Sequence, residues 1–459
     1  MPMKPASRLS SALPPDSLGF ALIRAAEAIA AVIAGRSLDA ALAACWQTYA
    51  PALSPSQRGA VQDLAYGTLR QYGRGDFFLA RLLRSPLPPG DDNTGKALLR
   101  ALLLAALYRL ETRPGDAHTI VDQAVNAAAG IDRGRFKALA NAVLRNRLRR
   151  DAELLSAANA DPVAFHQHPL WWIDRIRAAY PEHWQGILAA DNTHPPMALR
   201  VNRRRIGTDA YLALLSAAGI GARLLAHKES AILLDRPQAV DKLPGFFDGL
   251  VSVQDWGAQR AAPLLDAQAG MRVLDACAAP GGKAMHLLEL ADVDLLALDA
   301  EPARIARINE NLERLGLQAQ VKAADCRDMA SWWDGRPFER IIADVPCSAS
   351  GVVRRHPDGK WLRRETDIAG FARTQAEIVD ALWHVLAPGG KMLYCTCSLF
   401  PQENDMQVAS FAARHADALR LAMGGVDDRS GETRQRQHWQ LLPQAEHDGF
   451  FYALLQKRA

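Results

Sequence analysis

The chain has 459 residues, which exceeds what one compact core usually holds and predicts about two to four domains. Hydrophobic residues make up 49% of it and charged residues 23%, which is typical of a soluble globular protein and excludes a disordered chain. No uncharged stretch approaches the ~18 residues that a membrane span needs. Six cysteines in so long a chain exclude a small disulfide-stabilised scaffold. We therefore expect a cytoplasmic protein with reduced thiols and no membrane association.

The net charge of +4 is small, but basic residues are concentrated in three segments, 132–150, 200–205 and 354–364. The first carries seven basic residues against one acidic residue. Any one such cluster is most often a solvated helix face or loop. Three clusters in separate parts of the chain favour a polyanionic partner, of which nucleic acid is the simplest.

The N-terminal third of the chain is predicted to be helical. Residues 1–18 are rich in Pro and Ser and are expected to form a disordered tail. From 19 to 150, apolar residues recur at helical spacing, as in Leu22, Ala26 and Ile29, and strand-like runs are scarce. This pattern predicts an all-α domain over residues 19–150.

Residues 151–250 mix helical and extended patterns and are predicted to form a small α+β region that links the helical domain to the C-terminal part of the chain. The expected elements are short helices at 168–176 and 180–190, an extended segment after Pro195 and Pro196, and short strands at 222–227 and 230–235.

From residue 251 to 459, strands alternate with helices. Ile305, Ile308 and Leu312 share one stripe of a helix that ends at Gly316, a natural C-terminal cap. The alternation predicts an α/β, Rossmann-like domain with a parallel, doubly wound sheet whose ligands lie at the carboxyl ends of its strands. Expected elements are strands at 272–278, 294–300, 320–325, 340–346, 390–397 and 449–457, a long helix at 366–386 and a polar, glycine-containing loop at 423–440.

The stretch DACAAPGGK, residues 275–283, lies where the first of these strands gives way to a helix. Glycines at such a turn let the backbone approach a ligand and expose amide groups at the helix N-terminus. The spacing matches neither a phosphate loop nor the dinucleotide fingerprint. This pattern favours a nucleoside ligand without phosphates, such as S-adenosylmethionine.

Acidic residues end the next three strands, at Asp299, Asp325 and Asp344. A carboxylate at Asp299 is placed to accept hydrogen bonds from the hydroxyls of an adenosine ribose. Asp325 is expected to meet the adenine edge. Any one of these residues could simply cap a loop, but three at consecutive strand ends favour a binding site.

Two cysteines are expected on the same rim, Cys347 just past the fourth strand and Cys397 at the end of the fifth. The alternatives are a buried small hydrophobe, which suits Cys45 and Cys326 best, or metal ligation. Cys395 and Cys397 lack the further Cys or His pair of a tetrahedral site, so no metal is predicted.

A rim thiol beside a methyl donor has a chemical rationale. Carbon 5 of a pyrimidine is a poor nucleophile, but a thiolate that adds to carbon 6 converts the ring into an enamine whose carbon 5 can attack a sulfonium methyl group. An acidic neighbour such as Asp344 can hydrogen-bond the ring at N3 or at the exocyclic amine, and the base must be unstacked. These arguments alone do not rank Cys347 and Cys397.

The motifs DACAAPGGK, DVPCSASGVVRRHPDGKW and YCTCSLFPQEN resemble the core motifs of the RNA cytosine-C5 methyltransferases. The helical front end, with QRGAVQDLAYGTLRQYGR and LANAVLRNRLR, resembles the NusB-like domain of the bacterial 16S rRNA members of that family, the RsmB or Fmu/Sun type. The resemblance covers nearly the whole chain. It implies a NusB-like RNA-binding domain, a small linker region and a C-terminal class I methyltransferase domain.

The resemblance implies that methyl passes from S-adenosylmethionine to carbon 5 of a specific cytidine in small-subunit rRNA, cytosine 967 of 16S rRNA, through a covalent adduct. Cys397 is then the nucleophile, Cys347 assists product release, and Lys283 orients the reacting groups with Asp344. The implied cofactor-binding residues are Cys277, Ala278, Ala279, Pro280, Gly281, Gly282, Lys283, Asp299, Asp325 and Asp344.

The partner implied by the resemblance is 16S rRNA or a small-subunit assembly intermediate, with no obligate protein partner. Two alternatives stay open: another RNA such as tRNA as the substrate, or a non-catalytic RNA-binding or assembly factor. The presence of both cysteines and the glycine turn argues against the second. Cys395 has no assigned role.

Overall fold

The structure is a computed structural model, and it describes residues 13–50, 53–88, 95–225, 230–426 and 433–459. Contacts divide the chain into two compact units. The helical unit comprises residues 1–193 and 353–364, and the sheet unit comprises 194–352 and 365–459. The predicted domain boundaries stay predictions, and most of the predicted tail, residues 1–12, lies outside the described residues.

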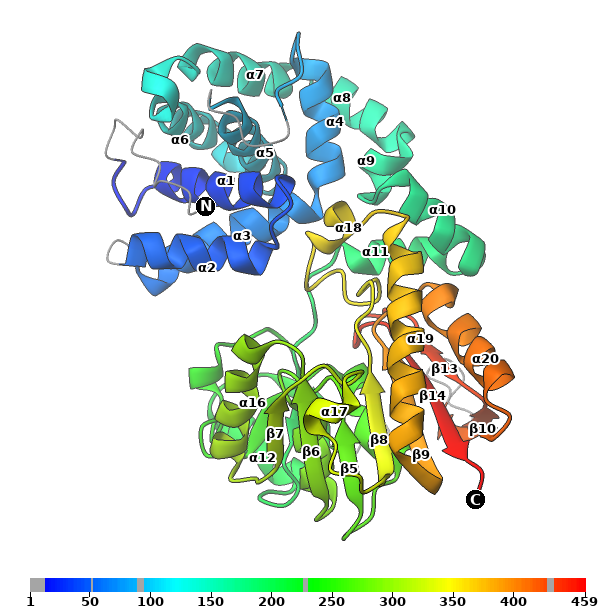
Figure 1. The fold of residues 1–459 in the computed structure, drawn as a ribbon. Coiled ribbons are helices and arrows are strands. Elements are labelled where there is room, and N and C mark those ends of the chain that lie inside the picture. Colours follow the sequence, from blue (N-terminus) through cyan, green and yellow to red (C-terminus); the bar gives the residue numbers. More distant parts are fainter. Residues whose placement is uncertain (1–12, 51–52, 89–94, 226–229, 427–432) are drawn as a thin grey trace. The chain divides into compact units, whose positions relative to one another are not determined.

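The helical unit is built around α5, whose residues Leu99 to Leu110 are almost all buried. Helix α1 packs against α2, α3, α5 and α6 (Figure 1). Helix α3 begins with a capping box, in which Ser54 and Gln57 each satisfy a backbone amide of the other. The helices of the helical unit are α1 (Leu18–Ile33), α2 (Leu38–Tyr49), α3 (Pro55–Arg70), α4 (Tyr72–Leu82), α5 (Lys96–Thr112), α6 (Ala117–Ala129), α7 (Lys137–Arg149), α8 (Asp151–Ala160), α9 (Pro162–His166), α10 (Leu170–Ala179), α11 (Trp184–Asp191) and α18 (Gly359–Leu362).

Segment 353–364 belongs to the helical unit although it lies between two elements of the sheet unit in sequence. Lys360 is fully buried, and its ammonium donates to the Arg70 carbonyl at 3.2 Å and to the Asn192 side chain at 2.7 Å. Asp358 accepts from the Leu38 amide at 2.9 Å. The prediction that the basic cluster 354–364 faces a polyanion is wrong for Lys360 and for Arg354. These two residues are 0% and 1% exposed, so their charged groups lie inside the fold and not on its surface.

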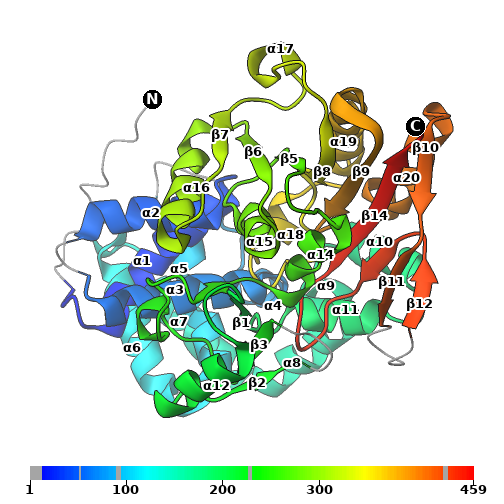
Figure 2. The same ribbon diagram turned by 90° about the horizontal axis from the view of Figure 1, so that it is seen from below.

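The sheet unit contains two main sheets (Figure 2). The smaller is antiparallel with strand order β2-β3-β1-β4 and carries α12. Its elements are β1 (Ala198–Val201), α12 (Thr208–Ala217), β2 (Ala222–Leu224), β3 (Ala231–Leu234) and β4 (Val251–Val253). The strands predicted at 222–227 and 230–235 are thus confirmed, in shorter form.

The larger sheet has the order β10-β14-β9-β8-β5-β6-β7, with β13 also paired to β14. Strands β7, β6, β5, β8 and β9 are parallel, whereas β14 runs antiparallel to β9 and β10 antiparallel to β14. The strands are β5 (Arg272–Asp275), β6 (Asp294–Asp299), β7 (Gln320–Ala323), β8 (Phe338–Asp344), β9 (Leu386–Thr396), β10 (Ala418–Leu421), β13 (Trp439–Leu441) and β14 (Phe450–Lys457).

Helices cover both faces of this sheet. Val273 and Leu274 are neighbours on β5 but join different hydrophobic clusters, because successive side chains of a strand point to opposite faces. One cluster includes α14, α15 and α16, and the other includes α17, α19 and α20. The remaining helices are α13 (Trp256–Gln259), α14 (Ala261–Leu265), α15 (Gly282–Leu290), α16 (Pro302–Leu315), α17 (Met329–Trp332), α19 (Asp367–Val385) and α20 (Asp405–Arg414).

The predicted Rossmann-like alternation is confirmed, including the end of α16 at Gly316, whose φ of 63° is the left-handed conformation of a glycine cap. The interpretation of 423–440 as a loop is wrong in part. Residues Met423–Val426 (β11) and Thr433–Arg436 (β12) form an antiparallel pair, and 427–432 lie outside the described residues. Polar and glycine-rich strands lack the alternation by which a strand is predicted.

Candidate active site

The candidate site lies where the strand order of the larger sheet reverses, between β5 and β8, which is where ligands bind in doubly wound sheets. Asp275 ends β5 and Asp344 ends β8. Asp344 pairs in register with Cys395 of β9, so Cys397 follows two residues beyond the same edge. The topology thus brings two acids and a thiol from distant parts of the sequence to one rim.

Helix α15 starts directly after the glycine turn. Gly281 precedes it with a φ of 99°, which only glycine adopts without strain, and no side chain caps the helix. Lys283 lies in the first turn and donates to Asp344 at 2.5 Å. Burial is the largest single influence on Lys283 and lowers its pKa, but the charge and hydrogen bond of Asp344, together with the neighbouring Cys395 and Asp275, outweigh burial and raise the pKa above its usual value. The amine therefore stays protonated and holds the Asp344 carboxylate.

Asp275 is a site residue that the sequence analysis missed, although it opens the motif DACAAPGGK. It is 1% exposed, and neither of its oxygens makes a hydrogen bond of normal geometry within the described residues. Burial, with a contribution from the charge of Asp344, raises the pKa of Asp275 to about 7. A carboxyl that titrates near neutrality at the edge of a binding site is a functional candidate.

Asp299 and Asp325 have different surroundings. Asp299 is buried at the end of β6, and its carboxylate accepts from the amides of Ala279 at 3.1 Å and Glu301 at 3.0 Å. It therefore fixes the glycine turn from the neighbouring strand. Asp325 is 40% exposed and forms an ion pair of 2.7 Å with Arg327, whose hydrogen bonds lower the pKa of Asp325.

The two rim thiols touch each other. The sulfur atoms of Cys347 and Cys397 are 3.4 Å apart. The hydrogen bond to Cys397, together with burial, raises the pKa of Cys347 well above its usual value. Cys347 is therefore a protonated thiol at neutral pH.

The other cysteines lie deeper. Cys395 is fully buried, and burial followed by the charge of Asp344 raises the pKa of its thiol. Cys277, on the glycine turn, is hydrogen-bonded to Cys326, and this contact and burial raise its pKa. Cys45 and Cys326 are buried, as expected. Of the six thiols, Cys347 and Cys397 are the pair at the rim.

A buried polar network holds the two cysteine loops together, and the sequence analysis did not single it out. Glu403 accepts from the Ser348 amide at 2.8 Å, the Ser398 hydroxyl at 2.6 Å and the Gln375 amide at 3.1 Å. The hydroxyls of Ser348 and Ser398 are 3.1 Å apart. Each serine follows one of the rim cysteines, so Glu403 fixes the spacing of the two thiols. The only sequence signal was its place in the motif YCTCSLFPQEN.

The residues at the turn fit a methyl donor of the S-adenosylmethionine type. Residues 276–282 have small side chains or none, which allows the backbone to approach a ligand closely. The buried acids Asp275 and Asp299 favour a ligand that carries hydroxyl donors. In the part of the chain that the structure describes, no group of three or more His, Cys, Asp or Glu residues could hold a metal ion, and no described helix is long and apolar enough to cross a membrane.

The order of parallel strands, the glycine turn and the acidic strand ends match the arrangement expected of the class of S-adenosylmethionine-dependent methyltransferases. Comparison with known proteins narrows this class. A family described as 16S rRNA methyltransferase RsmB/F matches residues 262–456, an RsmF/B-type ferredoxin-like domain matches 168–241, and the NusB family matches 21–149. We refer below to the smaller sheet with α12 as the ferredoxin-like subdomain.

Curated relatives match this chain over nearly its full length. A ribosomal RNA small subunit methyltransferase B from Pseudomonas putida is 45% identical, over 95% of this chain and 98% of that protein. The protein of the same name from Escherichia coli is 41% identical, over 95% and 98%. A methyltransferase homologue from Pyrococcus horikoshii is structurally similar, with a TM-score of 0.55 and 26% identity over 64% of this chain and 97% of that one.

The chain belongs to the RsmB family of ribosomal RNA small subunit methyltransferases. It is a methyltransferase that uses S-adenosylmethionine and modifies rRNA, with a NusB-like helical part, a ferredoxin-like linker and a Rossmann-like domain. The fold class and the enzyme class predicted from the sequence are confirmed.

Proposed function

We propose that the protein methylates carbon 5 of cytosine 967 in 16S rRNA through a covalent bond between Cys397 and carbon 6 of the base. The observation that carries the proposal is the contact between the Cys347 and Cys397 sulfurs, 3.4 Å apart, on the rim that also presents Asp344. The proposal places the protein in the cytoplasm, with 16S rRNA or an assembling small subunit as its partner.

Cys397 is the nucleophile in this proposal. Its thiolate forms a bond to carbon 6, and the electrons of the carbon 5–carbon 6 double bond move to carbon 5. Asp344, held by Lys283 at 2.5 Å, accepts a hydrogen bond from the exocyclic amine and orients the ring. Because Cys347 is kept protonated by its raised pKa, it does not compete as a nucleophile.

Release of the product breaks the bond between Cys397 and carbon 6. After carbon 5 has been methylated, loss of its proton to a base restores the double bond and expels Cys397 as a thiolate. Cys347 assists this step, because its sulfur lies against that of Cys397 and its loop is held by Glu403 through the amide of the next residue, Ser348.

S-adenosylmethionine, when bound, supplies the electrophilic methyl group. We propose that residues 277–283 hold it with Asp299, Asp325 and Asp344. The small residues of the turn and the buried position of Asp299 support this assignment. Both carboxylate oxygens of Asp325 accept hydrogen bonds from Arg327, so a contact with the cofactor uses the remaining lone pairs of these oxygens.

The basic segment 132–150 is our candidate for the RNA contact of the helical unit. Arg147 is excluded because it is 3% exposed and its guanidinium pairs with Asp151 and lies over the Phe78 ring. Arg145 and Arg149 are exposed on α7 and line a hollow between α6 and α7. Exposed guanidinium groups beside a hollow suit an RNA backbone.

The proposed function is tested by mapping 5-methylcytidine in 16S rRNA from cells with and without the protein, and by incubating it with labelled S-adenosylmethionine and undermethylated small subunits. The expected result is loss of the mark at one cytidine and label transfer to the same position in vitro. Label in tRNA alone would contradict the assigned substrate, and RNA binding without label transfer would show a binding factor.

A further inference from the structure

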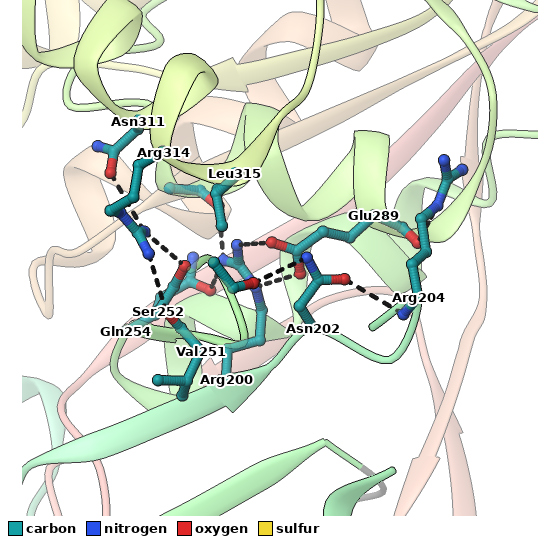
Figure 3. Close-up of polar contacts among 12 residues, drawn as sticks. Arg200, Asn202, Arg204, Val251, Ser252, Gln254, Glu289, Asn311, Arg314 and Leu315 are labelled. Carbon is teal, nitrogen blue, oxygen red and sulfur yellow. Dashed lines mark hydrogen bonds and ion pairs between the residues drawn. The ribbon is translucent and has the colours of Figure 1, made fainter. Parts of the chain in front are cut away.

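Arg200 is a fully buried arginine on β1 of the ferredoxin-like subdomain, with 1% of its surface exposed. It opens the basic segment 200–205, which the sequence suggested would face a polyanion. The structure contradicts this for Arg200, whose buried guanidinium donates to Glu289 (Figure 3). Arg204 and Arg205 donate to the carbonyls of Glu289 and Leu315, but both residues stay exposed. Three arginines of segment 200–205 therefore help to dock the ferredoxin-like subdomain.

The guanidinium of Arg200 contacts α15 near both of its ends. Its Nε and Nη2 donate to the two oxygens of Glu289 at 2.9 Å and 2.7 Å, which is a bidentate ion pair. Its Nη1 donates to the carbonyl of Gly282 at 2.8 Å and to the side chain of Gln254. Gly282 is the first residue of α15, and Glu289 is the last but one.

These contacts bear on the candidate active site because α15 carries it. The helix has nine residues, about 13 Å of length, and its N-terminus has no side-chain cap. Its first turn contains Lys283, which holds Asp344, and its start is the glycine turn itself. A shift or rotation of this short helix would move the turn and the ammonium group together.

We propose that Arg200 is a positioning residue for the methyl-donor site, which it acts on by clamping α15 from the ferredoxin-like subdomain. The affinity for S-adenosylmethionine then depends on the docking of a subdomain that contributes no residue to the proposed cofactor site. This inference rests on the proposed assignment of residues 277–283 to the cofactor.

The same interface supplies a matched control. Arg314, on α16, donates to the carbonyls of Phe246 and Val251 at 2.8 Å and 3.0 Å and to the Ser252 hydroxyl at 3.1 Å. It thus joins the ferredoxin-like subdomain to the larger sheet, as Arg200 does, but none of these three partners belongs to α15. Replacing Arg314 weakens the docking and removes no hydrogen bond to α15. Its further bond, to Asn311 at 3.4 Å, reaches the glycine turn only indirectly, because Asn311 donates to the Pro280 carbonyl at 3.1 Å.

The decisive variant is Arg200→Met combined with Glu289→Leu. Arg200→Met alone would leave a buried, unpaired carboxylate and could prevent folding, whereas replacing both members of a buried pair with apolar residues is often tolerated. Arg200→Lys is a second, milder variant, since a single ammonium can neutralise Glu289 but cannot also reach Gly282 and Gln254 in the same geometry.

The measurements are the dissociation constant for S-adenosylmethionine by calorimetry, the urea midpoint of unfolding, and amide hydrogen exchange of residues 281–290 in the ligand-free protein. We expect both Arg200 variants to bind about 10-fold more weakly and to exchange faster in α15, with a midpoint no lower than that of Arg314→Met. Arg314→Met is expected to bind like the wild type. Wild-type affinity and exchange in both Arg200 variants would overturn the proposal, as would an equal loss of affinity in Arg314→Met.

Asp299→Ala separates this inference from the proposed function. If Asp299→Ala does not weaken binding of S-adenosylmethionine, the cofactor site is misassigned and the premise of the inference fails. If Asp299→Ala weakens binding and the Arg200 variants do not, the site is correct and the positioning role of Arg200 is wrong.

Discussion

Asp275 gives the sharpest test of the electrostatics of the site. Its carboxyl is buried among Asp344, Lys283 and Asp299, and burial raises its pKa from 3.8 to about 7. The perturbation is Asp275→Asn, which keeps the shape of the side chain and removes its titration. Because the difference between two pKa values is a difference in folding free energy, the ionised form of Asp275 disfavours the folded state by about 4 kcal/mol.

The sign of the pH dependence of stability follows from whether the folded or the unfolded state binds the Asp275 proton more tightly. The folded protein keeps the Asp275 proton up to about pH 7, whereas the unfolded chain loses it near its ordinary pKa of 3.8. The stabilisation by the protonated carboxyl is therefore complete at pH values below 3.8 and is lost as the pH rises to about 7. From pH 5 to pH 7 the loss amounts to about 2 kcal/mol.

The assay is urea unfolding of the wild type and of Asp275→Asn, without ligand, at pH 5, 6 and 7. The free energy of unfolding of the wild type should fall relative to that of the variant by about 2 kcal/mol across this range. This change does not depend on how much the two proteins differ in stability at pH 5. Lys283 and Asp344 are present in both proteins, so their contributions cancel to first order. A difference that stays constant with pH would show that Asp275 is ionised throughout, and would refute the reasoning from burial.

Four further predictions concern the thiols, their support and the RNA contact. Cys397→Ala should abolish methyl transfer to RNA and leave the dissociation constant for S-adenosylmethionine within about 3-fold of the wild type, since it removes a bond that forms only during the reaction. Cys347→Ala should slow release, so that a protein–RNA adduct survives denaturing electrophoresis; its absence would contradict the division of roles. Glu403→Ala should lower the free energy of unfolding by about 3 kcal/mol, measured in urea, because it leaves several buried donors without a partner. Arg145→Glu with Arg149→Glu should weaken RNA binding in filter assays and flatten its salt dependence, while methyl transfer at saturating RNA persists.

Much of the sheet unit could be predicted because its signals are local. Strands β5, β6 and β8 are short apolar runs, and α16 has a clear apolar stripe and a glycine at its end. In a parallel sheet, neighbouring strand ends lie on one edge, so acids and thiols at those ends were expected to meet. The contact between Cys347 and Cys397 agrees with that expectation.

The supports of the site could not be predicted, because they depend on contacts between segments far apart in sequence. Glu403 binds the amide of Ser348, which is 55 positions away, and a polar residue in a turn gives no sign of such burial. Asp275 differs from Asp299 only in its surroundings: Asp299 accepts two backbone hydrogen bonds, and Asp275 accepts none of normal geometry among the described residues. The type of residue was visible in the sequence, but its environment was not.

The three basic segments show most clearly that the residue composition of a segment does not by itself determine its function. Segments 132–150, 200–205 and 354–364 look alike as runs of Arg and Lys, yet Arg200 and Lys360 are as buried as any apolar core residue. Arginine can serve inside a protein because its planar fork binds several oxygen atoms at once, as Arg200 does with Glu289 and Gly282. Exposure must therefore be established before a basic segment is assigned to RNA. By that criterion segment 132–150 is the strongest of the three candidates, because arginines such as Arg145 and Arg149 remain exposed along α7.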